Sequence, residues 1–288
     1  MTLAEVYGGS RPAISFELFP PKTAAGERAL EGHVERLMEF SPSYLTCTYG
    51  AGGSTREKTL DVIRAIKQRH GVPVATHLTC VGSTRDQLRE FLRQAVSDKV
   101  DYVVALRGDP PADQPSFQAV AGGLQYADQL VSLIHTEFPD FGIAVAGYPE
   151  VHQEAADAAA DLSNLKRKVD SGADVVITQL FYNNDDFFRF RDRYLQAGID
   201  VPLVPGILPV TGLAQIRRIT SMCGASLPAQ LVERLAEQDD ADWQFDVGVE
   251  FAIEQVRELI EQGVPGLHFF VLNRSQATTA LLEAVRSD

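Results

Sequence analysis

Eight short apolar segments, separated mostly by amphipathic stretches, constrain the fold of this 288-residue chain more than any other feature. The first four begin at residues 14, 44, 73 and 102, a spacing typical of successive strand–helix units. The eight predicted strands are Ile14–Phe19, Tyr44–Tyr49, Pro73–Cys80, Tyr102–Asp109, Gly142–Tyr148, Val175–Tyr182, Leu203–Val210 and Gly266–Asn273. The predicted helices include Ala24–Phe40, Ser54–His70, Thr84–Ser97 and Asp157–Ser171, with extra ones at Pro228–Glu237 and Ala241–Gln262. We therefore predict an α/β fold, a single (β/α)8 TIM barrel over residues 1–288 with extra helices before the last strand.

Composition excludes several classes of protein. The net charge of −13 argues against a nucleic-acid partner, and no apolar run approaches the ~20 residues that span a bilayer. Residues 1–10 lack a basic region followed by an apolar core, so we expect no signal peptide and no membrane partner. The spacing of Cys47, Cys80 and Cys223 fits neither a zinc site nor a redox motif. We expect three buried thiols, no metal and a cytoplasmic location.

Polar residues gather at the carboxyl ends of the predicted strands. The fourth strand ends in Arg107, Gly108 and Asp109 before two prolines, and alternation places Arg107 and Asp109 on one side. The alternative is an Arg–Asp pair that only closes a strand end. In a parallel barrel these ends share one mouth, where active sites are built, so we expect the site there.

Glu17 lies in an apolar strand beside Phe16, Leu18 and Phe19. A buried carboxyl either is paired or keeps its proton with a raised pKa, and the second case suits a general acid. An internal salt bridge is the alternative.

Two further patterns suggest a phosphate-bearing cofactor. Residues 49–55 form a glycine-rich turn, although Thr55 replaces the third glycine of a dinucleotide fingerprint, so a tight strand–helix turn is the default. Asp161, Asn164 and Lys168 share one helical face with Arg167 beside it. An aspartate suits ribose hydroxyls and the cations suit a pyrophosphate, whereas a solvated face is the alternative. His77 alone is more often a satisfied core histidine.

Nine segments together resemble the bacterial, single-domain type of methylenetetrahydrofolate reductase. They are SFELFPPKT, TCTYGAGGSTREKT, THLTC, LRGDPP, GYPEVH, DLSNLKRKVDSGAD, ITQLFY, PGILPV and HFFVLNR, in consistent order from about Ile14 to Arg274. The resemblance implies a (β/α)8 barrel that binds FAD non-covalently and reduces 5,10-methylenetetrahydrofolate to 5-methyltetrahydrofolate. NADH or NADPH would supply the electrons, and the nucleotide and the folate would occupy one site in turn. The product would serve methionine synthesis. We also expect a homo-oligomer.

The same resemblance implies a role for individual residues. Glu17 would be the acid that opens the folate ring, and Asp109 would stabilise the resulting cation. The implied FAD contacts are Tyr49, Ala51, His77, Arg107, Gly108, Asp109, Tyr126, Ala127, Tyr148, His152, Asp161, Asn164, Arg167 and Lys168. The implied substrate contacts are Thr48 and Gln179, the latter with both folate and nucleotide, and Gln215 and Arg274 with folate.

The chain departs from the family pattern at Phe270, where tyrosine is common, at Ile219, where an aromatic residue can occur, and in the 110–125 loop and the GAGGST turn. Three alternatives remain open at this point. They are a proline-dehydrogenase-like FAD barrel, a folate reductase without flavin or with a protein electron donor, and a non-enzymatic barrel that binds folate or a partner protein.

Overall fold

The computed structural model describes residues 2–49, 56–110 and 116–287, and their strands form one parallel sheet. The strands are β1 (Ala13–Leu18), β2 (Tyr44–Cys47), β3 (Val74–Thr79), β4 (Tyr102–Leu106), β5 (Gly142–Gly147), β6 (Val175–Thr178), β7 (Leu203–Val204), β8 (Gly206–Ile207) and β9 (Gly266–Phe270). The helices are α1 (Leu3–Val6), α2 (Ala24–Met38), α3 (Arg56–His70), α4 (Arg85–Ser97), α5 (Ala127–Glu137), α6 (Ala158–Asp170), α7 (Asn184–Gln196), α8 (Leu213–Cys223), α9 (Ala229–Ala236), α10 (Ala241–Glu261) and α11 (Gln276–Arg286). Each predicted strand and helix is present, so the barrel prediction is confirmed.

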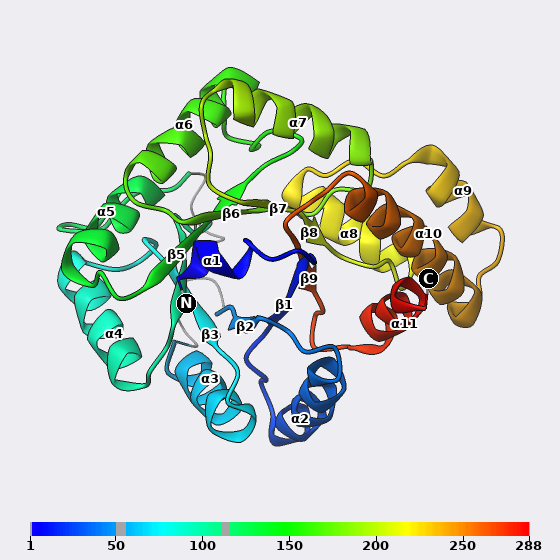
Figure 1. Cartoon of the computed structure of the whole chain (residues 1–288), viewed down its shortest axis with the longest axis horizontal. Helices are drawn as coiled ribbons and strands as arrows, with labels where there is room; N and C mark the ends of the chain where they lie inside the picture. Colours follow the sequence, from blue (N-terminus) through cyan, green and yellow to red (C-terminus); the bar gives the residue numbers. More distant parts are fainter. Residues whose placement is uncertain (1, 50–55, 111–115, 288) are drawn as a thin grey trace.

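The sheet closes into a barrel at Pro205. The strand order is β7-β6-β5-β4-β3-β2-β1-β9-β8, and the helices surround the ring of strands (Figure 1). The predicted seventh strand is divided, because Pro205 has no N–H to continue a ladder. Residues before it pair with β6, whereas Gly206 and Ile207 pair with β9. The Gly206 N–H instead donates to the Thr178 hydroxyl of β6 at 2.9 Å, which joins the two edges.

The strands separate two hydrophobic cores because their side chains alternate between faces. Outward residues such as Phe16, Leu78 and Val103 pack against the amphipathic helices. Inward residues such as Tyr102 and Val175 form a second cluster inside the barrel. This inner cluster fills the amino-terminal end, so the carboxyl end is the side open to a ligand.

Helix α1, which we did not predict, covers the amino-terminal end of the barrel and lies across the ring of strands in Figure 1. Thr2 and Glu5 cap it reciprocally, a capping box with a plain sequence signature. Leu3 and Tyr7 pack on the first residues of the strands, including Ala13 and Tyr44.

Helices α8, α9 and α10 form the predicted insertion between β8 and β9 and gather on one side with α11 (Figure 1). In the described part of the chain, no helix combines the length and apolar character needed to cross a bilayer. Cys47 and Cys80 are buried as predicted, but Cys223 is half-buried, so the prediction of three buried thiols is wrong for that residue.

Candidate active site

The predicted site residues within the described ranges lie around the carboxyl-terminal mouth of the barrel. Glu17 and His77 are in β1 and β3, and Thr48, Arg107 and Gln179 follow strands directly. The others lie on the loops and helices that come next along the chain. Ala51 falls outside the described residues.

Glu17 is the centre of a buried ionic cluster. Its side chain points into the barrel, where Oε2 lies 3.2 Å from Nε2 of His77 and 3.6 Å from Nε2 of His268. At 3.2 Å the His77 nitrogen is within ion-pair distance but not aligned as a hydrogen-bond donor. The Glu17 side chain keeps 11% exposure, so the carboxyl is not completely sealed. The alternative we gave for Glu17, an internal ion pair, is therefore present in the structure.

The expected raised pKa of Glu17 is wrong for this ligand-free arrangement. Burial raises the pKa of the carboxyl, but the close approach of the His77 and His268 imidazoles outweighs burial and lowers the pKa to about 2. In a coupled group of this kind a proton belongs to the cluster rather than to one residue. Glu17 is therefore ionised in the ligand-free protein, and it can act as an acid only after the cluster has taken up a proton.

His268 and Ser15 are site residues that our sequence reasoning missed. Ser15 on β1 and His268 on β9 are partners in the strand register, and the Ser15 hydroxyl lies 2.8 Å from Nδ1 of His268. A signal was present, because His268 is an ionisable residue inside an apolar strand, as Glu17 is.

The Arg107-Gly108-Asp109 segment presents backbone and charge at the rim. Gly108 adopts φ +83°, and a Cβ there would lie 2.9 Å from both Thr79 and Val81, so the position requires glycine. Arg107 is held by Glu154, which was not predicted, through two hydrogen bonds of 2.5 and 2.8 Å that raise the pKa of the guanidinium. Asp109 is exposed at the mouth.

Only some of the residues that we predicted to share one face of helix α6 point toward the barrel. Asp161 is buried and accepts a hydrogen bond from the His152 N–H at 3.2 Å, and burial raises the pKa of its carboxyl. Lys168 reaches under Tyr148 and donates to the Ala146 carbonyl at 2.5 Å, and burial lowers the pKa of its ammonium to about 8. Lys168 retains partial exposure at its surface, and its charge lacks a directly bonded carboxylate among the described residues.

Asn164 and the neighbouring Arg167, the other two residues of this prediction, are exposed. Asn164 accepts a hydrogen bond from Arg167 at 2.5 Å, and Arg167 lies 3.9 Å from Asp128. Asp161 and Lys168 therefore form the buried part of this helical face, and Asn164 forms its exposed part.

Aromatic residues complete the rim on either side. The Tyr49 hydroxyl lies 3.1 Å from the Thr79 hydroxyl and so ties the end of β2 to β3. Tyr126 is 53% exposed and precedes Ala127, the first residue of α5. Tyr148 meets the His152 ring edge to face at 4.6 Å.

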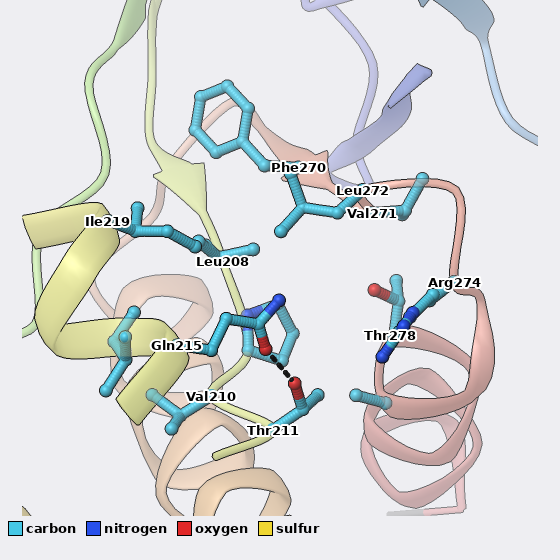
Figure 2. Close-up of a pocket in the computed structure, with 13 residues that line it drawn as sticks. Leu208, Val210, Thr211, Gln215, Ile219, Phe270, Val271, Leu272, Arg274 and Thr278 are labelled. Carbon is cyan, nitrogen blue, oxygen red and sulfur yellow. Dashed lines mark hydrogen bonds between the residues drawn. The ribbon is translucent and has the colours of Figure 1, made fainter. Parts of the chain in front are cut away.

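A pocket beside the mouth, between α8 and α11, is lined by Gln215 and Arg274, two of the residues that we expected to bind folate. Gln215 on α8 and Arg274 after β9 face it from opposite walls, and Phe270 and Ile219 cover its apolar end (Figure 2). Gln215 accepts a hydrogen bond from Thr211 at 2.6 Å. Arg274 and Gln215 are both exposed, so their polar groups can reach a ligand.

Thr48 and Gln179 lie away from the residues that line this pocket, at the ends of β2 and β6. The Gln179 side-chain oxygen accepts the Leu180 N–H at 2.9 Å, and the Thr48 hydroxyl donates to the Tyr49 carbonyl at 3.5 Å. Across the described residues, no group of His, Cys, Asp and Glu has an arrangement suited to a metal ion.

The sequence model of the methylenetetrahydrofolate reductase family matches residues 3–286. The chain belongs to this family. The 5,10-methylenetetrahydrofolate reductase of Escherichia coli (strain K12) is 41% identical over 283 residues, which cover 97% of this chain and 92% of the relative. Methylenetetrahydrofolate reductase (NADH) 1 of Arabidopsis thaliana is 37% identical, covering 94% of this chain and 48% of the plant protein. The family consists of oxidoreductases, so the chain is an enzyme, and the proline-dehydrogenase-like and non-enzymatic alternatives are set aside.

One solved structure confirms the fold. An uncharacterized protein from Clostridium thermocellum that binds two copies of 5-methyl-5,6,7,8-tetrahydrofolic acid superposes with a TM-score of 0.67. It covers 98% of this chain at 19% sequence identity, which is a similarity of fold.

Proposed function

We propose that this member of the methylenetetrahydrofolate reductase family is a single-domain flavoenzyme over residues 1–288. It would reduce 5,10-methylenetetrahydrofolate to 5-methyltetrahydrofolate with NADH or NADPH in a ping-pong sequence. The observation that carries the proposal is the Glu17–His77–His268 cluster, a buried carboxyl between two imidazoles at the mouth of a barrel. The product would feed methionine synthesis in the cytoplasm, and we expect a homo-oligomer.

The residues at the rim fit non-covalent FAD. Gly108 lets the chain turn at φ +83° directly after β4, with its α-carbon packed against Thr79 and Val81, so that Arg107 and Asp109 are held at the rim on either side of it. Lys168 is a largely buried cation without a bonded carboxylate in the described chain, and the exposed Arg167 and the Glu154-paired Arg107 lie on the same rim. These cations suit a pyrophosphate, and the Asp161 carboxylate suits ribose hydroxyls. The remaining rim residues, Tyr49, Tyr126, Tyr148 and His152, supply aromatic and polar walls.

When bound, FAD supplies the hydride chemistry, accepting a hydride from the reduced nucleotide and passing one to the folate. The protein must supply a proton, because the five-membered ring of methylenetetrahydrofolate opens to an iminium cation only when a ring nitrogen is protonated. Glu17 would deliver that proton from the buried cluster. Asp109, exposed at the mouth, would stabilise the positive charge of the iminium.

Folate would also occupy the pocket beside the mouth that Gln215 and Arg274 line. Arg274 presents a guanidinium that suits the carboxylates of the glutamate tail, and Phe270 and Ile219 provide apolar contact for the aromatic part. Gln215 would donate a hydrogen bond from its amide. Thr48 and Gln179 would contact the ligand that occupies the mouth. The folate ligand bound by the Clostridium thermocellum protein of the same fold supports this choice of substrate.

Two anaerobic half-reactions test the proposal. The purified protein should carry FAD that denaturation releases, and the flavin absorbance should bleach with NADH or NADPH. Addition of methylenetetrahydrofolate should then restore the absorbance and yield one 5-methyltetrahydrofolate per flavin. A protein that neither contains nor takes up FAD would contradict the cofactor, and a bleached protein that methylenetetrahydrofolate cannot reoxidise would contradict the substrate.

A further inference from the structure

The interior of the barrel is divided into an apolar and a polar half near the mouth. Inward side chains from the apolar half are Val104, Ala144, Ile177 and Val204. Inward side chains from the polar half are Ser15, Glu17, Thr46, His77 and His268, all at most 8% exposed. Burying polar groups costs free energy unless they pair, so the contacts of Ser15 with His268 and of Glu17 with both imidazoles stabilise this cluster.

Three hydroxyl groups extend this polar half toward the base of the barrel. The phenolic oxygens of Tyr7 and Tyr44 lie 2.8 Å apart, and the neighbouring Ser15 hydroxyl lowers the pKa of each phenol, although burial outweighs this effect. Burial raises the pKa of both phenols, so they remain neutral and can each donate and accept. We call Tyr7, Tyr44 and Ser15 the hydroxyl file. It leads from the closed end, under α1, to Nδ1 of His268.

The hydroxyl file decides which nitrogen of His268 carries a proton. If a neutral His268 ring carried its proton on Nδ1, the lone pair of Nε2 would face the Glu17 carboxylate at 3.6 Å, an unfavourable contact in a buried site. If the proton is on Nε2, that N–H faces Glu17 and Nδ1 accepts from the Ser15 hydroxyl at 2.8 Å. The Ser15 hydroxyl can donate to Nδ1 of His268 and still accept a hydrogen bond from a phenol of the hydroxyl file.

We propose that His268 is a positioning residue that presents an Nε2–H to Glu17, and that Ser15 holds it in this tautomer from within the hydroxyl file. The inference deepens the function proposed above and rests on it for its catalytic consequence. After Glu17 gives its proton to the folate nitrogen, the buried carboxylate needs a donor to stabilise it. His268 supplies that donor, which makes Glu17 a stronger acid than a carboxyl in an apolar wall.

The other titratable groups near Glu17 are the inward-facing His77 on β3 and Tyr44 on β2, and Cys47, which lies on the outward face of β2. Burial raises the pKa of the Cys47 thiol and of the Tyr44 phenol, and the charge of Glu17 raises both further. Both remain neutral at working pH. A pH dependence altered by Ser15→Ala therefore reports on Glu17 and the imidazoles.

The ¹⁵N NMR spectrum of histidine-labelled, ligand-free protein tests the tautomer without any turnover. The chain has six histidines, and the His268→Gln spectrum assigns the ring in question. We expect the Nε2–H form of His268 in the wild type and a mixture of tautomers in Ser15→Ala. Thr46→Val is a matched control, since the buried Thr46 hydroxyl has no hydrogen-bond partner in the described structure, and it should leave the tautomer unchanged. An Nδ1–H form in the wild type would overturn the inference, as would a tautomer unchanged in Ser15→Ala.

The catalytic consequence is tested on the folate half-reaction as a function of pH. Loss of one hydrogen bond to a charged group changes a rate by roughly tenfold or more, so Ser15→Ala should be slowed by about that factor. The limb of its pH–rate profile should move to higher pH by about one unit, because a less stabilised carboxylate holds its proton more tightly. Slowing at all pH values without a moved limb would show a merely structural role and overturn the inference. If Ser15→Ala does not fold, Tyr44→Phe and the wild-type spectrum serve instead.

The two levels of the argument fail separately. A wild-type protein with the Nε2–H tautomer but no folate half-reaction would contradict the proposed function and leave the tautomer assignment intact. A working folate half-reaction with the Nδ1–H tautomer would contradict the tautomer assignment and leave the proposed function intact.

Discussion

Replacing Lys168 by alanine should weaken FAD binding and remove its pH dependence. Lys168 is the cation on α6 that reaches the barrel wall, where burial lowers its pKa to about 8. A hydrogen bond between an ammonium and a phosphate contributes about 1.5–3 kcal/mol, so the dissociation constant at pH 7 should rise by one to two decades. Folate affinity should change less.

The pH dependence follows from the sign of the pKa shift. In the apoprotein the ammonium is mostly protonated at pH 7 and mostly neutral at pH 9, on either side of a pKa of about 8. A phosphate favours the protonated form, so FAD binding takes up a proton above pH 8. Wild-type affinity should therefore fall by about tenfold between pH 7 and 9, and Lys168→Ala should lack this fall. Since the folded pKa is lowered from 10.5, the apoprotein should also become more stable as the pH rises from about 8 to 10.5.

Titration of apoprotein with FAD, followed by flavin fluorescence at both pH values, gives these constants. Lys166→Ala is the matched control, because Lys166 lies on the same helix but pairs with Asp170 at the surface, 3.1 Å away. It should bind FAD as the wild type does. A Lys168→Ala protein with wild-type affinity at pH 7, or with the wild-type pH dependence, would refute the assignment of Lys168 to the cofactor.

Three other predictions concern charge and packing. Asp109→Asn should slow folate reduction and raise the flavin midpoint potential, as measured with redox dyes, since a negative charge near the flavin is lost; an unchanged potential would contradict the role. Gly206→Ala should destabilise the fold by about 1–3 kcal/mol in chemical denaturation, because its Cβ would lie 2.2 Å from the Thr178 carbonyl oxygen, whereas Gly32→Ala, with nothing within 4 Å, should stabilise it. Because the pKa of Glu17 is lowered from 4.5 to about 2, its stabilising contribution is complete above pH 4.5 and is lost as the pH falls toward 2. Glu17→Gln should show a shallower acid loss of stability over that range, and identical acid profiles would contradict the ion pairing.

The barrel could be predicted because strand and helix periodicity are local properties. The division of the seventh strand at Pro205 was not predicted, although proline is a local signal, because its effect depends on which neighbours the flanking residues pair with. Helix α1 was missed because four residues carry too little periodicity, and only the capping box of Thr2 and Glu5 marks it.

The candidate site was predictable in its membership but not in its electrostatics. The apolar setting of Glu17 correctly indicated burial, yet the direction of its pKa depends on His77 and His268, which are 60 and 251 positions away in the sequence. Only the closed barrel brings β1, β3 and β9 together around one carboxyl oxygen. The pairing of Arg107 with Glu154 is equally non-local, since it depends on the path of the loop after β5.

The central claim is that Glu17 supplies the proton for folate reduction, and stopped-flow measurement of the two half-reactions of Glu17→Gln tests it most directly. Hydride transfer from NADH needs no proton for a leaving nitrogen, so bleaching of the flavin should remain near the wild-type rate. Reoxidation by methylenetetrahydrofolate needs ring opening, and since general acid catalysis contributes ~10²–10⁴ in rate, it should slow by at least about two decades. Equal slowing of both half-reactions, or an unimpaired reoxidation, would contradict the claim.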